Sequence, residues 1–189
     1  MVEFRNVTKS FDKRQVLDNV NLVLEQGKFT MLTGESGRGK TTLLRIAAGL
    51  EKADGGEFIS DERVAVMFQE PRLLPWKNAR DNIRAVLAKE HFPLADKYLS
   101  AVGLSEDGDK YPHELSGGMA QRVALARFLA FSYATDATLL LLDEPFSALD
   151  DSTAEKMLIL LREHSKGKTV LMVTHRSSDA EFADKIITL

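Results

Sequence analysis

The chain has 189 residues, which fits one domain and is long enough to bury a hydrophobic core without disulfides. It contains no cysteine, which excludes thiolate-ligated zinc and iron–sulfur sites and fits a reducing compartment. The formal net charge is −3, so no overall basic field recruits nucleic acid or anionic lipid, and any polyanion site must be local.

The amino-terminal stretch MVEFRNVTKSF has no positively charged start followed by an apolar run, so no signal peptide is predicted. The densest apolar stretch, TLLLLDEP, is far shorter than the ~18 residues that a membrane-spanning helix needs. We therefore expect any membrane role of this chain to depend on a partner.

Alternating apolar and polar residues predict strands in the first part of the chain, and a helical composition after a glycine-rich turn predicts one helix. The strands are expected at 2–8, 16–24, 28–34, 55–60 and 63–69, and the helix at 40–50, with Gly49 at its carboxyl end. From Asn78 to about Gly103 the pattern is helical in two segments. A further helix should start at Ser116, because serine is a good N-cap.

Strands and helices alternate in the last third of the chain. Strands are expected at 138–143, 169–175 and 185–189, with helices at about 152–164 and 177–183. This order predicts an α/β fold with a mostly parallel sheet covered on both faces and a small antiparallel β-subdomain beside it. We expect a single domain over 1–189, with a helical insertion subdomain at about 78–133.

The stretch GESGRGKT fits the phosphate-binding pattern G-x-x-x-x-G-K-[ST], with an apolar strand before it and a helix after it. Its backbone N–H groups can hold phosphate oxygens, Lys40 can reach the β- and γ-phosphates, and the Thr41 hydroxyl can bind Mg²⁺. The alternative is an ordinary loop between strand and helix, which the context disfavours. The predicted nucleotide site comprises Gly34, Glu35, Ser36, Gly37, Arg38, Gly39, Lys40, Thr41 and Thr42.

The stretch LLLLDEP places two carboxylates at the end of a buried strand, where open parallel sheets form ligand sites. Asp143 can hold Mg²⁺ and Glu144 can polarise an attacking water, although a solvated strand end is an equally common reading of such residues. Gln69 and His175 also follow predicted strands. A lone glutamine or histidine at a strand end more often has a structural role. Gln69 and His175 indicate a functional site because both are expected at the same edge of the sheet as the two phosphate-site motifs.

Between these motifs stands LSGGMAQR, which alone is also an ordinary helix-capping arrangement. Followed by LLLLDEPFSALD, it makes the sequence resemble the ATP-binding-cassette (ABC) ATPases over essentially its whole length. The matching features are an aromatic residue at Phe11, the Walker A loop, Gln69, the LSGGMAQR signature, Walker B with Glu144, the SALD loop ending at Asp150, and His175.

The resemblance implies a P-loop NTPase core that binds ATP and Mg²⁺, with Glu144, His175, Lys40 and Gln69 as catalytic residues. The metal ligands would be Thr41, Gln69 and Asp143. Phe11, at a position where tyrosine is common, would stack on adenine. The remaining nucleotide contacts would be Ser116, Gly117, Gly118 and Asp150.

In the family, one nucleotide lies between the Walker A loop of one subunit and the signature of another. The resemblance therefore implies an ATP-bound dimer with a second copy of this chain or a homologous ATPase. Hydrolysis would remove the γ-phosphate that the signature holds, so the dimer contact should weaken.

The stretch QEPRLLPWKNARDNI resembles importer ATPases for nitrate, sulfonate and taurine. This implies integral-membrane permease subunits, a solute-binding protein, a place at the cytoplasmic face of the cell membrane, and no nucleic acid partner. Trp76 could line the groove for a permease helix or pack in the core. The chain stops at DKIITL, so no C-terminal regulatory domain is expected. The alternative function is a soluble ABC-type ATPase that acts on a non-transport partner.

Overall fold

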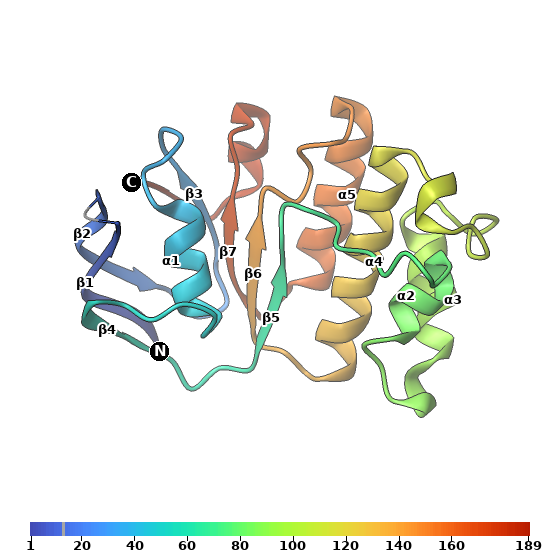
Figure 1. Ribbon diagram of the computed structural model, residues 1–189, viewed down its shortest axis with the longest axis horizontal. Coiled ribbons are helices and arrows are strands. Elements are labelled where there is room, and N and C mark those ends of the chain that lie inside the picture. The colour runs from blue at the N-terminus through green and yellow to red at the C-terminus, as the bar shows by residue number, and fades with distance from the viewer. Residues whose placement is uncertain (13) are drawn as a thin grey trace. The chain divides into compact units, whose positions relative to one another are not determined.

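The structure is a computed structural model that describes residues 1–12 and 14–189 (Figure 1). Contacts between residues divide it into two units. The first unit contains Met1–Val66, Ala137–Glu144 and Ser165–Leu189. The second unit contains Met67–Asp136 and Pro145–His164.

A small antiparallel sheet in the first unit has the order β2-β1-β4, formed by β1 (Val2–Phe11), β2 (Arg14–Leu24) and β4 (Gly55–Ile59). Its strands confirm the expected antiparallel layer. The first two strands are longer than predicted because their pairing continues to Phe11 opposite Arg14.

A five-stranded sheet has the order β5-β6-β7-β3-β8. Its strands are β3 (Phe29–Thr33), β5 (Val64–Met67), β6 (Leu139–Asp143), β7 (Thr169–Val173) and β8 (Lys185–Thr188). The pairings of β3 with β7 and β8, and of β6 with β7, are parallel, which confirms the predicted parallel sheet. Every residue of β6 and β7 is buried, as the continuous apolar runs indicate.

Helix α1 (Lys40–Ala47) packs against β2, β6 and β7 in the first unit. Leu43 and Leu44 join a core cluster with residues of both sheets, such as Phe4 and Leu141. Ala48 is the C-cap of the helix, and Gly49 follows it with φ +69° and an N–H that donates to the Ile46 carbonyl. Glycine adopts this left-handed conformation without steric cost, so the predicted helix end is confirmed.

The second unit is helical. It contains α2 (Ala79–Arg84), α3 (Pro93–Ala101), α4 (Gly117–Ala134) and α5 (Asp151–His164), with short 3₁₀ helices η1 (Lys89–His91) and η2 (Pro112–Glu114). The helical pattern predicted from Asn78 to Gly103 is interrupted after α2. Ala88 is extended, and Pro93 begins α3 because its fixed φ suits a first helical position.

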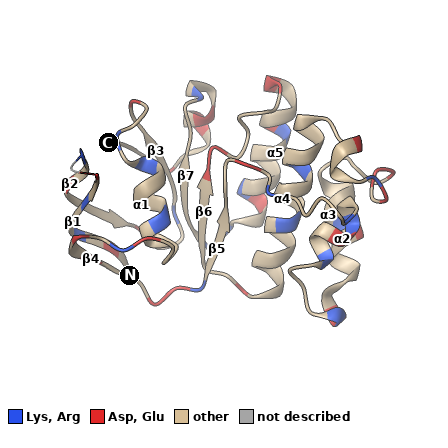
Figure 2. Cartoon of the chain, in the orientation of Figure 1, with Lys and Arg blue, Asp and Glu red and all other residues tan. Residues whose placement is uncertain are grey.

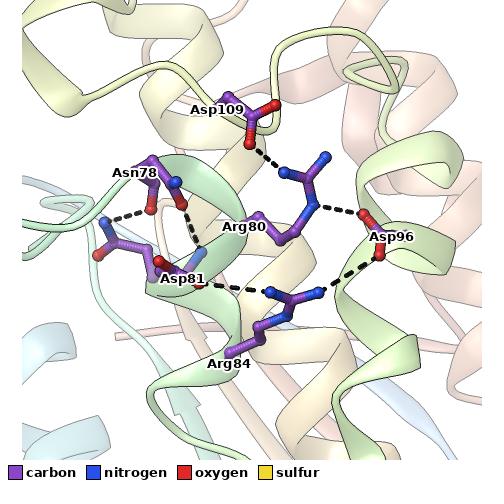
Figure 3. Close-up of polar contacts among 7 residues, drawn as sticks. Asn78, Arg80, Asp81, Arg84, Asp96 and Asp109 are labelled. Atoms are coloured by element: carbon purple, nitrogen blue, oxygen red, sulfur yellow. Dashed lines mark hydrogen bonds and ion pairs between the residues drawn. The ribbon is translucent and has the colours of Figure 1, made fainter.

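Helices α2 and α3 are joined by ion pairs (Figure 3). The Arg80 guanidinium reaches Asp96 on α3, with 2.6 Å between Nε and Oδ1, and Asp109 in the following loop. Arg84 lies one turn further along α2 and pairs with Asp81 and Asp96. Two arginines thus share one carboxylate on α3, which fixes the pairing of the two short helices.

Acidic and basic residues are interspersed along the elements of both units (Figure 2). Within residues 1–12 and 14–189, no helix has the length and apolar character required to cross a bilayer. The remaining helical turn is η3 (Ser177–Phe182), which follows β7 in the first unit.

Candidate nucleotide-binding site

The glycine-rich loop joins β3 to α1 and adopts backbone angles that other residues rarely reach. Gly39 has φ +87° and forms the N-cap of α1. A Cβ atom at this position would lie 2.6 Å from Leu17 Cδ2 and 2.7 Å from the Val16 carbonyl oxygen. Glycine is therefore required here both by the left-handed backbone and by the close approach of β2.

Lys40 is the first residue of α1, and its side chain folds back over the loop. Its Nζ donates to the carbonyl oxygens of Gly34 and Glu35, at 2.9 and 2.8 Å, and the residue is only 5% exposed. The Arg38 side chain instead lies at the surface and pairs with the Glu35 carboxylate at 3.3 Å. The loop thus holds one buried cation at its centre and one exposed cation at its rim.

Asp143 is the last residue of β6 and is 4% exposed. Its Oδ1 has no hydrogen-bond partner among the described residues. Burial raises the pKa of the Asp143 carboxyl above its ordinary value, while a hydrogen bond from the Thr41 hydroxyl and the Lys40 charge lower the pKa in part. A buried, unsatisfied carboxylate oxygen beside a threonine hydroxyl is an arrangement that fits a hard divalent cation.

Glu144 directly follows β6 and no longer takes part in the alternation of side chains between the two faces of the sheet. Its φ is +44°, and its N–H donates to the Val173 carbonyl. Its side chain reaches His175, with 3.1 Å between Oε1 and Nε2. A left-handed backbone at a non-glycine residue costs on the order of 1–3 kcal/mol, and such strain is common at functional sites.

The loop that carries His175 is fixed by polar residues that belong to no recognised sequence motif. Asp179 accepts hydrogen bonds from the Thr174 hydroxyl at 2.7 Å and from Arg176 Nε at 3.2 Å. Thr174 Oγ1 in turn accepts from the Arg176 N–H. A threonine before the histidine and an aspartate four residues after it were the only signals in the sequence.

A cavity of about 300 Å³ lies between the glycine-rich loop and the loop of His175. Gly34, Thr174 and His175 are among the residues that line it. The first glycine of the loop and His175 therefore face a shared open space.

The hairpin of β1 and β2 ends beside the same glycine-rich loop. Arg14 of β2 lies opposite Phe11 of β1 in the strand register. The Arg14 side chain reaches the loop, because its Nη2 lies 3.6 Å from the position that a Cβ atom on Gly37 would occupy. No sequence motif marks Arg14 as a cation near the loop. Phe11 is 43% exposed, so its ring is accessible at this end of the hairpin.

The other predicted site residues belong to the second unit: Gln69, Ser116, Gly117, Gly118 and Asp150. Ser116 is the N-cap of α4 as predicted, because its Oγ accepts from the Met119 N–H at 3.2 Å. Asp150 accepts from the Thr153 N–H at 2.9 Å at the start of α5. Trp76 is 70% exposed, so the alternative that it packs in the core is wrong.

A P-loop and an acidic strand end on a parallel α/β sheet define a class of nucleotide-binding ATPases. The sequence model of the family described as "ABC transporter" matches residues 17–147. The chain belongs to this family of transporter ATPases, whose cassettes bind ATP.

The chain is also similar to ATP-binding proteins named for sulfonate import. The aliphatic sulfonates import ATP-binding protein SsuB 3 of Pseudomonas savastanoi pv. phaseolicola is 43% identical over 98% of this chain and 71% of its own length. SsuB 2 of Paraburkholderia xenovorans is 45% identical over 100% of the chain and 76% of its own length.

A solved structure with the same fold is the ATP-binding cassette MJ0796 in a dimeric, post-hydrolysis state bound to ADP and Pi. The TM-score is 0.89 at 33% identity, over 100% of this chain and 94% of that chain.

Proposed function

We propose that this chain is the ATP-hydrolysing subunit of an importer and that its first unit holds the nucleotide. The observation that carries the proposal is the pair of Glu144 and His175, which meet at the carboxyl ends of β6 and β7. Parallel sheets bind ligands at this edge, and the glycine-rich loop follows the neighbouring strand β3.

The phosphates would be bound by the loop and the base by Phe11. Backbone N–H groups of residues 34–42 and the Lys40 ammonium supply donors and positive charge for the β- and γ-phosphates. Phe11 offers an exposed ring for stacking on adenine.

The proposed ligands of Mg²⁺ are Thr41, Asp143 and Gln69. When bound, it would neutralise charge that develops on the phosphate oxygens. Among residues 1–12 and 14–189 no three His, Asp or Glu side chains form a metal-binding group. A hydroxyl, a carboxylate and an amide oxygen suit Mg²⁺, which takes few protein ligands and completes its coordination shell with phosphate and water oxygens.

Glu144 would act as the general base toward the attacking water. The positive φ of Glu144 turns its carboxylate toward His175. When Nε2 carries the imidazole proton, His175 donates it in a hydrogen bond to Oε1 and so orients the carboxylate. The histidine would thereby keep the base in position while the γ-phosphate is cleaved.

The signature residues would contact a nucleotide held by a second ATPase subunit. Ser116 and Gly117 are exposed at the start of α4, where helix N–H groups and the helix dipole favour anions. Gly118 and Asp150 complete this proposed partner-facing set. The dimeric form of MJ0796 supports such an arrangement.

The imported solute would be an aliphatic sulfonate, as in the names of the similar proteins. Permease subunits and a solute-binding protein would complete the importer, with this chain at the cytoplasmic face of the membrane. The exposed Trp76 supports a permease contact, because a large exposed aromatic side chain is typical of interface anchors. Co-purification from native membranes separates this proposal from a soluble ABC-type ATPase with another partner.

The hydrolytic role is tested by Glu144→Gln, which removes the base but keeps the size of the side chain. We expect turnover to fall by about 10²–10⁴-fold, the usual contribution of a general base. ATP binding should persist, and the ATP-bound dimer should accumulate because its γ-phosphate is not removed. Steady-state ATPase assays and size-exclusion chromatography with ATP measure these effects.

Glu163→Gln is a matched control, since Glu163 is an exposed glutamate on α5 outside the proposed site. It should hydrolyse ATP as the unmodified chain does. Turnover of Glu144→Gln at the rate of the unmodified chain would contradict the assignment of the base.

A further inference from the structure

Lys9 on β1 is a buried lysine that the proposed function does not use. The residue is 9% exposed, and its Nζ contacts the Lys52 carbonyl at 2.8 Å, Glu51 Oε1 at 2.9 Å and Asp54 Oδ1 at 3.1 Å. An ammonium group has three N–H donors, so these three acceptors satisfy it completely. The two carboxylates also raise the pKa of Lys9, which keeps the group charged at neutral pH.

The fixed ammonium lies over the ring of Phe11, 5.1 Å from the ring centroid, which is within the range of a cation–π contact. Asp54 also fixes the backbone before the ring, because its Oδ2 accepts from the Ser10 N–H at 2.7 Å. The same carboxylate thus holds both the cation and the strand segment that carries the aromatic side chain. The Phe11 ring remains 43% exposed.

We propose that Lys9 is a positioning residue for the adenine base of the bound nucleotide, acting through Phe11. The ammonium holds the ring in one orientation and draws its π-electron density away from the exposed part of the ring. An electron-rich purine stacks better on a ring whose own negative quadrupole is reduced. This inference rests on the proposed stacking of adenine on Phe11.

The test compares binding of ATP with binding of inorganic tripolyphosphate, which lacks a base. In the full chain with Mg²⁺, Lys9→Met should weaken ATP binding about fivefold, in the range of a partly desolvated cation–π contact. Tripolyphosphate affinity should stay the same, because the phosphate loop is unchanged. In a Phe11→Leu background, Lys9→Met should cause no further loss of ATP affinity.

Two further variants separate positioning from folding. Lys9→Gln keeps an N–H donor for the Lys52 carbonyl while removing the charge, and it should weaken ATP binding as Lys9→Met does. Arg5→Met is the matched control, because Arg5 lies on the same strand and pairs with Glu3 and Glu57. Its ATP affinity should equal that of the unmodified chain.

The outcomes distinguish this inference from the proposed function. Equal losses of ATP and tripolyphosphate affinity in both Lys9 variants would overturn the inference, because the effect would then be structural. Unchanged ATP affinity in the Lys9 variants, with a loss in Phe11→Leu, would overturn the inference and leave the stacking role intact. Unchanged ATP affinity in Phe11→Leu would overturn the stacking role itself.

Discussion

Asp179 is a buried charged residue, and both of its carboxylate oxygens accept hydrogen bonds from residues that flank His175. Thr174 precedes the histidine and Arg176 follows it, so the backbone is held on both sides. The His175 side chain itself is exposed, and its Nε2 lies 3.1 Å from Glu144 Oε1. At the scale of single residues, the orientation of the histidine loop therefore depends on a buried aspartate that bonds to both neighbours of His175.

Asp179→Asn should lower the rate of ATP hydrolysis about tenfold and leave the KM for ATP nearly unchanged. The amide keeps the size of the side chain but removes a charged acceptor from a buried network, which costs on the order of 1–3 kcal/mol. Because Asp179 acts only through the histidine loop, the effect should appear in kcat. Steady-state kinetics over a range of ATP concentrations separate kcat from KM.

Ser178→Ala is the control for this prediction, since Ser178 is exposed in the same turn. Asp179→Glu, which keeps the charge, should recover part of the rate. A tenfold rise of KM with unchanged kcat in Asp179→Asn would show that the aspartate acts on nucleotide binding instead.

At the scale of elements, helices α3, α4 and α5 meet at a chain of hydrogen bonds. Ser132 Oγ lies 3.2 Å from the Leu129 carbonyl, to which it donates, and 2.6 Å from His164 Nε2. The Tyr98 hydroxyl lies 3.3 Å from His164 Nδ1. A neutral imidazole protonated on Nε2 satisfies all these contacts, with Tyr98 as the donor to Nδ1.

The Tyr98 hydroxyl should make the stability of the fold depend on alkaline pH. Burial raises the pKa of Tyr98 from 10.0 to about 12. Between pH 10.0 and about pH 12 the unfolded chain releases the tyrosine proton while the folded chain keeps it. The free energy of unfolding therefore falls as the pH rises. At pH 11 the loss should be about 1.4 kcal/mol, which corresponds to one pKa unit.

Urea unfolding at pH 8 and pH 11 measures this loss, with Tyr98→Phe as the variant that cannot ionise there. Tyr98→Phe should be less stable than the unmodified chain at pH 8, by about 1 kcal/mol for the lost hydrogen bond, and the difference should vanish or reverse at pH 11. Tyr111→Phe removes an exposed hydroxyl and is the control. A difference for Tyr98→Phe that stays constant with pH would refute the prediction.

Most elements could be predicted from the sequence because their signals are local. The apolar runs of β6 and β7, the capping Ser116 and the Gly49 helix end each need only a few neighbouring residues. The break after α2 was harder to place, because the helical composition continues through it to Pro93.

The candidate site was predictable only where a motif fixes the spacing, as in the glycine-rich loop. Lys9 contacts residues more than 40 positions away along the chain, and no periodicity connects them. Asp179 is close to His175 in sequence, but its burial follows from tertiary packing. Pairings of this kind become visible only when the strands and loops are brought together.

At the scale of the whole molecule, the two glycines of the signature have different surroundings within the second unit. A Cβ atom on Gly117 would meet nothing within 4 Å. A Cβ atom on Gly118 would lie 3.3 Å from the Ala148 carbonyl oxygen and 3.4 Å from Leu149 Cδ2, so Gly118 packs against the SALD loop of its own chain. Of these two glycines, Gly117 is the one with room for a methyl group within the second unit.

Gly117→Ala should therefore fold normally but fail to form the ATP-bound dimer. Alanine favours the helix over glycine by up to about 1 kcal/mol, so thermal stability should be retained or raised. If the start of α4 contacts a nucleotide on the partner subunit, the added methyl group occupies the place of that contact. Size-exclusion chromatography with ATP in the Glu144→Gln background measures dimer formation, and calorimetry measures ATP affinity of the monomer, which should not change.

Gly118→Ala provides the comparison, because its methyl group would lie 3.3 Å from the Ala148 carbonyl oxygen, so the SALD loop must shift slightly. Its melting temperature should therefore lie below that of Gly117→Ala. Dimer loss in Gly117→Ala without loss of stability would place the phosphate contact of the signature on the partner's nucleotide. If Gly117→Ala dimerised as fully as its parent, the exposed end of α4 would have no part in the dimer contact. A collapse of ATP affinity in the monomer would instead assign the signature to the nucleotide site of its own chain.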